Sequence, residues 1–337
     1  MWRRLFPFLV LCLCASAALG APEVAGNRRP VKAVADKRLE VGGGELPLYV
    51  SRDWSVPLPG VTRAVVVLHG RLRDADVYYK TALKAQAAAG AAGRETIMIV
   101  PQFLAGIDVE AFHLPESVLH WSLVGWEGGD AAKGPAPVSS FEAVDAILAR
   151  LADRERFPDL QEVVVAGHSG GGQVVQRYAI LGRGEAALGT VGVTTRYVVA
   201  NPSSYAWFTA DRPEPAIAAY CHGYNDWKYG MKKLPPYAQG TPAALEKAYI
   251  ARRVIYLLGT ADIDPNQSAL DKSCMAEAQG PTRFARGHAY FAAMQAANGA
   301  AFAHRLVEVP GVGHDGEKML TSACGLASVF DVPGCGQ

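Results

Sequence analysis

The sequence lacks an excess of charge of either sign and the common metal-binding spacings. Lysine and arginine number 33 and aspartate and glutamate 32, for a formal net charge of +1. A nearly neutral chain lacks the excess of positive charge that binds a phosphate backbone, so we expect no nucleic-acid partner. No Cys-x-x-Cys or His-Glu-x-x-His occurs, so we expect no zinc site.

Long apolar runs are also missing, since none approaches the roughly 20 residues of a membrane span. The run from Leu5 to Leu13 follows two arginines and precedes small residues ending at Gly20. This layout predicts a secretory signal peptide over residues 1–20, with an uncleaved anchor as the alternative. We therefore expect a mature chain of residues 21–337 without stable membrane insertion, secreted or periplasmic, with a net charge of −1 in place of +1.

The cysteines fit an oxidising compartment. Two of the six lie in the predicted signal peptide, and four remain: Cys221, Cys274, Cys324 and Cys335. An even number in an exported protein favours two disulfides. Cys324 and Cys335 bracket a short C-terminal segment, and pairing them leaves Cys221 for Cys274, although sequence alone leaves the connectivity open.

Short apolar, β-branched runs recur along the chain and predict strands. They are RAVVVLHG, ETIMIVPQF, QEVVVAGHS, TRYVVANPS, RRVIYLLGT and HRLVEVPG. Helical patterns at 82–92, 141–151 and 174–181 lie between some of them, and RLEVGGGELPLYV predicts an earlier hairpin. Because continuous apolar strands imply a sheet buried on both faces, we predict one α/β domain with a doubly wound, mostly parallel sheet. Residues 203–249, rich in prolines and aromatics, are expected to be an insertion after the sixth strand, forming a lid.

One serine stands where an α/β sheet exposes reactive groups. Gly167, Ser169 and Gly171 form Gly-x-Ser-x-Gly between a strand and a helix. A strained turn there presents the hydroxyl, and the glycines avoid collisions around it. The alternatives are a plain tight turn and a phosphate-binding loop, although the Gly-Lys-Ser/Thr ending of the latter is missing. Ser169 is the candidate nucleophile.

A base and an acid follow the ends of later strands. His314 lies in a glycine-flanked loop after the last strand, and Asp262 follows the preceding strand, with Asp264 as the alternative acid. A serine needs a base that takes its proton and a group that orients that base. Cation binding by the loop 262–271 is a rival use, but the loop lacks the glycine and the glutamate of an EF-hand.

The oxyanion donors are predicted from two turns. The helix start after Ser169 presents the Gly170 N–H, and the turn after RAVVVLHG presents the Arg71 N–H. His69, at the same turn, is expected to be structural.

These motifs resemble those of the α/β-hydrolases. The likeness runs from about residue 63 to residue 314 and rests on LHG, GHSGG, GTAD and GVGH, each after a predicted strand. It implies the α/β-hydrolase fold and a triad of Ser169, Asp262 and His314. The His-Gly-Gly-Gly motif of one lipase and esterase subclass is absent.

Aromatic residues suggest where substrate binds. Trp126, Tyr205 and Trp207 are expected to line an apolar cleft, or alternatively to form the insertion's own small core, and Tyr78 is a further candidate contact. We predict an exported serine hydrolase that cleaves a small-molecule or polymeric carboxylic ester through an acyl-enzyme, without cofactor or metal. A peptidase or amidase with the same triad and a non-catalytic binding protein are the alternatives.

Overall fold

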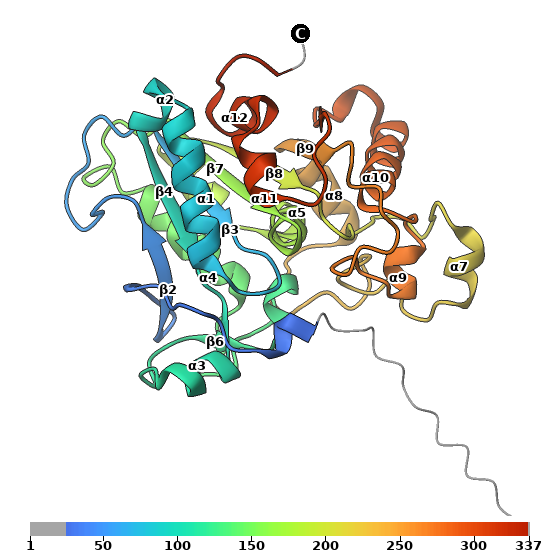
Figure 1. Ribbon diagram of the computed structural model, residues 1–337, viewed down its shortest axis with the longest axis horizontal. Helices are drawn as coiled ribbons and strands as arrows, with labels where there is room; N and C mark the ends of the chain where they lie inside the picture. Colours follow the sequence, from blue (N-terminus) through green and yellow to red (C-terminus); the bar gives the residue numbers. More distant parts are fainter. Residues whose placement is uncertain (1–24, 336–337) are drawn as a thin grey trace, which may run out of the picture.

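A computed structural model describes residues 25–335, so the predicted signal peptide lies outside the described residues (Figure 1). Its main sheet has eight strands in the order β1-β2-β4-β3-β7-β8-β9-β10. The strands are β1 Lys37–Val41, β2 Gly44–Val50, β3 Arg63–Leu68, β4 Thr96–Pro101, β7 Glu162–His168, β8 Thr194–Ala200, β9 Arg253–Gly259 and β10 Arg305–Val309. The pairings β1·β2 and β2·β4 are antiparallel and the others parallel. The predicted mostly parallel sheet and hairpin are confirmed.

Helices cover both faces of this sheet. The α-helices are α1 Ala75–Ala88, α2 Ala91–Arg94, α3 Gly106–Phe112, α4 Ser140–Leu151, α5 Gly170–Leu181, α6 Glu185–Thr190, α7 Pro215–Tyr220, α8 Pro242–Ile250, α9 Cys274–Glu277, α10 Arg283–Asn298, α11 Gly316–Thr321 and α12 Ala323–Phe330. Three 3-10 turns, η1 Ala25–Arg28, η2 Gly125–Gly128 and η3 Gly299–Ala301, and a two-stranded ribbon, β5 Leu104–Ala105 with β6 His120–Trp121, complete the elements.

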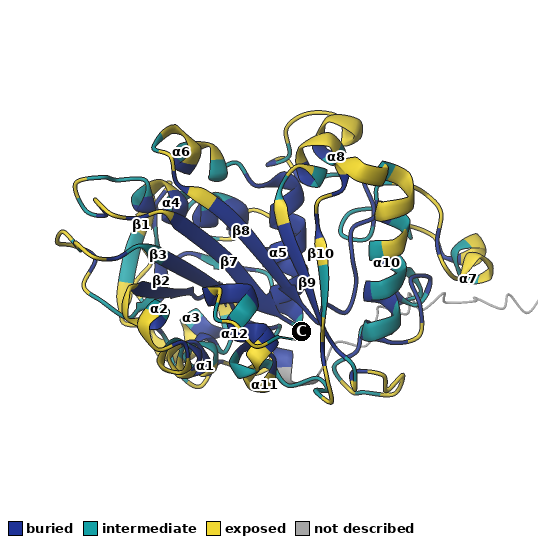
Figure 2. Cartoon of the chain, turned by 90° about the horizontal axis from the view of Figure 1, so that it is seen from above, coloured by how far each residue is buried: buried dark blue, intermediate teal, exposed yellow. Residues whose placement is uncertain are grey.

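Alternating residues of each central strand pack into two separate cores. Val66 of β3 belongs to the core that includes residues of α4 and α5, whereas Val65 and Val67 belong to the core with α1, α11 and α12. Figure 2 shows these strands as buried between the helices. Burial on both faces explains why the strands read as continuous apolar runs rather than as alternating ones.

Two helices differ from the prediction in their boundaries. The helix expected at 82–92 begins earlier, at Ala75, and ends before Gly90, whose positive φ of 59° separates α1 from α2. The helix expected from residue 174 begins at Gly170, so the glycines form its first turn. The sequence did not predict a helix at these glycines because glycine has a low intrinsic helix propensity. Their close packing against neighbouring strand ends explains why the positions are glycines.

The segment 203–249 follows β8, the sixth strand of the main sheet along the chain. It contains α7 and most of α8, and α7 lies beside α9 at the edge of the molecule (Figure 1). A disulfide between Cys221 and Cys274 ties it to the start of α9, and a second joins Cys324 to Cys335. Among the described residues, no helix has the length and apolar character needed to cross a membrane.

Candidate active site

Ser169 occupies a strained turn between β7 and α5. Its φ is +59°, in the left-handed region that side chains other than glycine rarely adopt. Its N–H donates to the Ala200 carbonyl over 3.0 Å. A Cβ on Gly171 would lie 2.0 Å from the Leu68 carbonyl oxygen, so only glycine fits there. The end of β3 therefore packs closely against the turn and helps to fix the direction of the serine hydroxyl.

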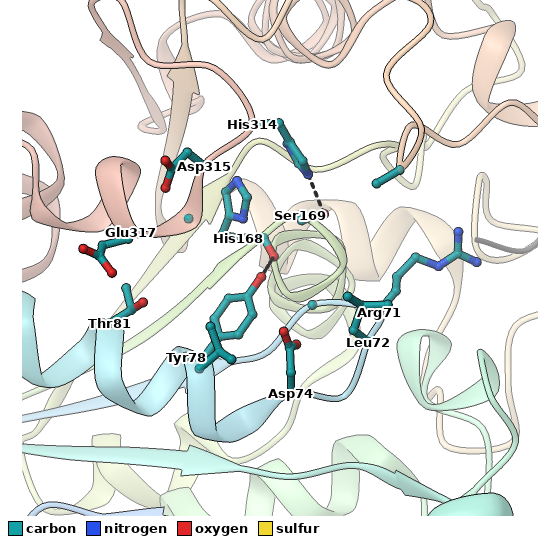
Figure 3. A pocket seen from close by; sticks show the side chains of 14 residues that line it. Arg71, Leu72, Asp74, Tyr78, Thr81, His168, Ser169, His314, Asp315 and Glu317 are labelled. Atoms are coloured by element: carbon teal, nitrogen blue, oxygen red, sulfur yellow. Dashed lines mark hydrogen bonds between the residues drawn. The ribbon is translucent and has the colours of Figure 1, made fainter. Parts of the chain in front are cut away.

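The His314 ring links this hydroxyl to a carboxylate. Its Nε2 lies 2.9 Å from Ser169 Oγ (Figure 3). Its Nδ1 lies 2.8 Å from Asp262 Oδ2. Asp262 is 3% exposed. Asp264, by contrast, is exposed and accepts a hydrogen bond from the Asn266 N–H. The structure thus brings Asp262, rather than Asp264, to His314, so that the imidazole can donate from Nδ1 and accept from the serine at Nε2.

The surroundings of His314 favour its neutral form. Burial lowers the pKa of His314, and the positive charge of Arg283 lowers it further, while the hydrogen bond to Asp262 opposes both. The net direction is below the ordinary value for histidine. A neutral imidazole is what proton transfer from a serine requires.

Arg283, at the start of α10, holds the second oxygen of Asp262. Its Nη1 lies 3.3 Å from Asp262 Oδ1, and its Nε donates to Ser203 Oγ over 2.8 Å. Its Nη2 donates to Gln267 over 3.0 Å, and the side chain is fully buried. The sequence analysis missed Arg283, because nothing in the sequence links a helix start to a carboxylate 21 residues earlier.

The two predicted oxyanion donors lie next to each other. A Cβ on Gly170 would be 2.8 Å from the Arg71 amide nitrogen. Among the described residues, none accepts a hydrogen bond from that amide. The Arg71 side chain turns away instead, and its Nε donates to Glu127 over 2.9 Å. The Arg71 amide therefore lies beside Gly170, the residue that follows Ser169.

A cavity of about 410 Å³ opens at Ser169 and His314. One wall is the turn from Gly70 to Asp74 and the first turns of α1, including Tyr78, and the other runs from His314 to Glu317. Tyr78 is the one predicted substrate contact that lines this cavity, and its hydroxyl donates to the His168 carbonyl over 3.4 Å.

The other three aromatic candidates lie in the core, which corrects the prediction that they line the cleft. Trp126 stacks on Phe103 with 5.3 Å between ring centroids, and Tyr205 stacks on Tyr290 at 4.7 Å. Trp207 packs edge-to-face on Tyr290. All three are buried. Their rings exclude water by packing on one another, and neither they nor any other residue of 203–249 lines the cavity.

His69, expected to be structural, makes two hydrogen bonds within the protein. The Phe103 N–H donates to its Nε2 over 2.9 Å, so Nδ1 carries the proton and donates to the Gly70 carbonyl over 2.8 Å. Burial lowers the pKa of His69 to about 4, which keeps the ring neutral. It supports the turn that presents the Arg71 amide.

The described residues contain no group of three or more His, Cys, Asp or Glu side chains that could hold a metal ion. In the loop 262–271, Asp262 bonds His314 and Asp271 accepts from the Tyr229 hydroxyl and the Ser273 N–H. These carboxylates have protein partners rather than a shared centre, so the loop is not arranged as a cation site.

Comparisons with known proteins identify the fold. No family model matches the chain, and no curated protein matches it. Poly(aspartic acid) hydrolase-1 from Sphingomonas sp. KT-1 matches in structure with a TM-score of 0.62 and 24% identity, over 90% of this chain and 99% of that one. A poly(3-hydroxybutyrate) depolymerase, LpqC from Bordetella parapertussis, matches with a TM-score of 0.60 and 24% identity, over 86% and 85%. At this identity the likeness shows a shared fold.

Proposed function

The chain has the α/β-hydrolase fold, and within it we propose a serine hydrolase that cleaves carboxylic esters. The observation that carries the proposal is the chain of two hydrogen bonds from Ser169 through His314 to Asp262, at the floor of a cavity. A strained serine, a neutral base and a buried orienting carboxylate are the parts that acyl transfer needs.

The proposed reaction begins when Ser169 Oγ attacks the substrate carbonyl while His314 Nε2 takes its proton. Asp262 holds the imidazole in the required tautomer and stabilises the imidazolium that forms. The N–H groups of Gly170 and Arg71 donate to the oxyanion of the tetrahedral intermediate. His314 then protonates the leaving alcohol, and a water molecule, activated by the same imidazole, hydrolyses the acyl-serine.

The walls of the cavity support an ester with an apolar part. Leu72 and Val77 are 45% and 48% exposed on the α1 side of the cavity, where they can contact an acyl chain. Two solved structures with this fold are named as a depolymerase of poly(3-hydroxybutyrate) and a hydrolase of poly(aspartic acid). We propose a small-molecule or polymeric ester as substrate. The two disulfides support export to an oxidising compartment.

Hydrolysis of p-nitrophenyl esters beside amino-acid anilides tests this function, with the Ser169→Ala variant as control. We expect ester turnover that falls by at least about 10⁴-fold in kcat/KM in the variant, because Ser169 Oγ is the hydroxyl that lies within hydrogen-bond distance of His314 Nε2. A fluorophosphonate probe should label the wild type at Ser169 and leave the variant unlabelled.

Anilide cleavage without ester turnover would replace the esterase with an amidase. Absence of both turnover and labelling would contradict the serine mechanism and favour a non-catalytic binding protein.

A further inference from the structure

Three carboxylates line the cavity at Ser169, and two of them already have partners. Asp315 caps α11, accepting from the Lys318 N–H over 3.0 Å. Glu317 pairs with Lys84 Nζ over 2.7 Å. Both therefore have structural roles that need no ligand.

Asp74 is the exception. It occupies the N-cap position of α1, where an aspartate normally accepts a helix N–H, yet its side chain makes no cap hydrogen bond. Among the described residues, no other residue donates to either of its oxygens, and Oδ1 is buried without a partner. Burial raises the pKa of Asp74, while a hydrogen bond from its own backbone N–H and the charges of Arg73 and Lys32 oppose that rise. A buried carboxylate oxygen without a donor, as Oδ1 is, costs stability, and such groups in native proteins need an explanation.

The position of Asp74 supplies that explanation. It follows the oxyanion turn by three residues and lines the same cavity as Ser169. Figure 3 shows its carboxylate pointing toward the space between Tyr78 and Ser169. His168, which also lines this cavity and is 3% exposed, has its ring Nε2 buried without a hydrogen-bond partner. Among the described residues, each of these two side chains beside the nucleophile thus has one buried polar atom without a partner.

The other charges around the cavity do not neutralise Asp74. The guanidinium of Arg71 is bound to Glu127, whose second oxygen lies 3.1 Å from Lys228 Nζ. Lys84 is bound to Glu317. Arg73 and Lys32 lower the pKa of Asp74 by their charge, but neither lines the cavity. The Asp74 carboxylate therefore lines the cavity without a cation hydrogen-bonded to it, so a ligand that brings a donor would gain a charge-assisted hydrogen bond.

We propose that Asp74 selects substrates carrying a hydrogen-bond donor, a hydroxyl or an ammonium group, near the scissile ester bond. This inference rests on the proposed ester hydrolysis at Ser169 and names its substrate class. An ammonium group gains Coulomb attraction as well as the hydrogen bond, whereas a carboxylate in the same place is repelled. Substrates that are themselves polyanions are accordingly disfavoured.

A matched set of esters tests the selectivity. The reference is ethyl butyrate, and the donor is placed on the acyl side in ethyl 3-hydroxybutyrate and ethyl 3-aminobutyrate and on the alcohol side in 2-hydroxyethyl butyrate. Ethyl hydrogen succinate supplies the anion. We expect at least one donor ester to exceed ethyl butyrate by about tenfold or more in kcat/KM, with the succinate slowest.

Two variants assign the effect to the carboxylate. Asp74→Asn removes the charge but keeps an acceptor, so it should reduce the advantage of the ammonium ester most. Asp74→Ala removes both and should abolish the hydroxyl advantage as well. Glu317→Gln is the matched control, because it removes the same charge from the same cavity at a carboxylate that is already paired. It should change the ratios by less than about threefold.

The outcomes separate the two proposals. If all five esters are hydrolysed through Ser169 at similar rates, or if the donor advantage survives Asp74→Ala, the role of Asp74 is overturned and the serine hydrolase stands. If none is hydrolysed and Ser169 is not labelled by the fluorophosphonate, the proposed function fails and the inference fails with it. Thermal melts of each variant show that the folded protein is being compared.

Discussion

The segment 203–249 and the cavity wall built by residues 70–81 differ in how their apolar side chains are buried. In the segment, aromatic rings are buried and stacked on one another, as Tyr205 and Trp207 are on Tyr290. In the wall, the apolar side chains of Leu72 and Val77 are exposed at the cavity. We infer that a dense run of aromatic residues indicates a core, whereas exposed apolar side chains beside the strand ends indicate the ligand side.

The segment nevertheless acts on the site indirectly. Lys228, within it, lies 3.1 Å from Glu127 Oε2, and Glu127 Oε1 accepts from Arg71 over 2.9 Å. Burial opposes the ionisation of Glu127, but Lys228 and Arg71 together hold its pKa below the ordinary value. This buried pairing connects the segment to the side chain of Arg71, whose amide lies beside Gly170. We interpret the segment as a support for the turn that carries Arg71.

The largest expected effect lies on the catalytic side of the comparison. Asp262→Asn should lower kcat/KM by about 10⁴-fold, because the amide stabilises the wrong imidazole tautomer while leaving the packing unchanged. Asp264→Asn, in the same loop but exposed, should stay within about threefold. Steady-state ester hydrolysis measures both, and equal effects of the two changes would contradict the assignment of the acid.

The buried aromatic residues of the segment should affect stability rather than activity. Trp207→Ala should lower the free energy of unfolding by about 3–5 kcal/mol, because it removes a buried ring from the core. KM for esters should change little, since Trp207 lines no part of the cavity. Denaturant unfolding and ester kinetics on the same sample give both numbers.

Leu72→Ala and Tyr220→Ala complete that test. Leu72 is exposed on the cavity wall, so its removal should raise KM with little change in stability. Tyr220 belongs to the same segment as Trp207 but is 66% exposed, and its removal should change neither quantity. A Trp207→Ala variant that raises KM while keeping its stability would restore the segment as a substrate lid.

The sequence predicts best those features that are encoded by residues close together in the chain. The strands and the turn at Ser169 are encoded in contiguous residues, so β-branched runs and glycine spacing located them. Strand order predicts that Asp262 or Asp264 pairs with His314, and the choice of Asp262 came from the structure, in which its Oδ2 lies 2.8 Å from His314 Nδ1. The roles of Asp74, Arg283 and the buried aromatics depend on partners far away in the chain, such as Arg283 on Asp262 and Trp207 on Tyr290. An aspartate before a helix is also typical of an N-cap, so the sequence gives no sign that the Asp74 side chain makes no cap hydrogen bond.

The smallest expected effect is a shift in the pH profile. It tests the role of Arg283, which binds Asp262 on the side away from His314. Burial lowers the pKa of His314, and the positive charge of Arg283 lowers it further. The same guanidinium binds Asp262 Oδ1. Because the base acts in its neutral form, activity is lost as the pH falls through this pKa. Arg283→Gln removes the positive charge, raises the pKa of His314 and should move the acid limb of kcat/KM to higher pH.

Arg286→Gln is the matched control for that shift. Arg286 lies on the same helix and is equally buried, but it bonds the carbonyls of Ser203, Gly280 and Asp271 rather than Asp262. Both variants should lose stability, since each leaves buried acceptors without a donor. Only Arg283→Gln should displace the acid limb. Equal displacement in both would mean that loosened packing, rather than the charge beside Asp262, sets the pKa of the base.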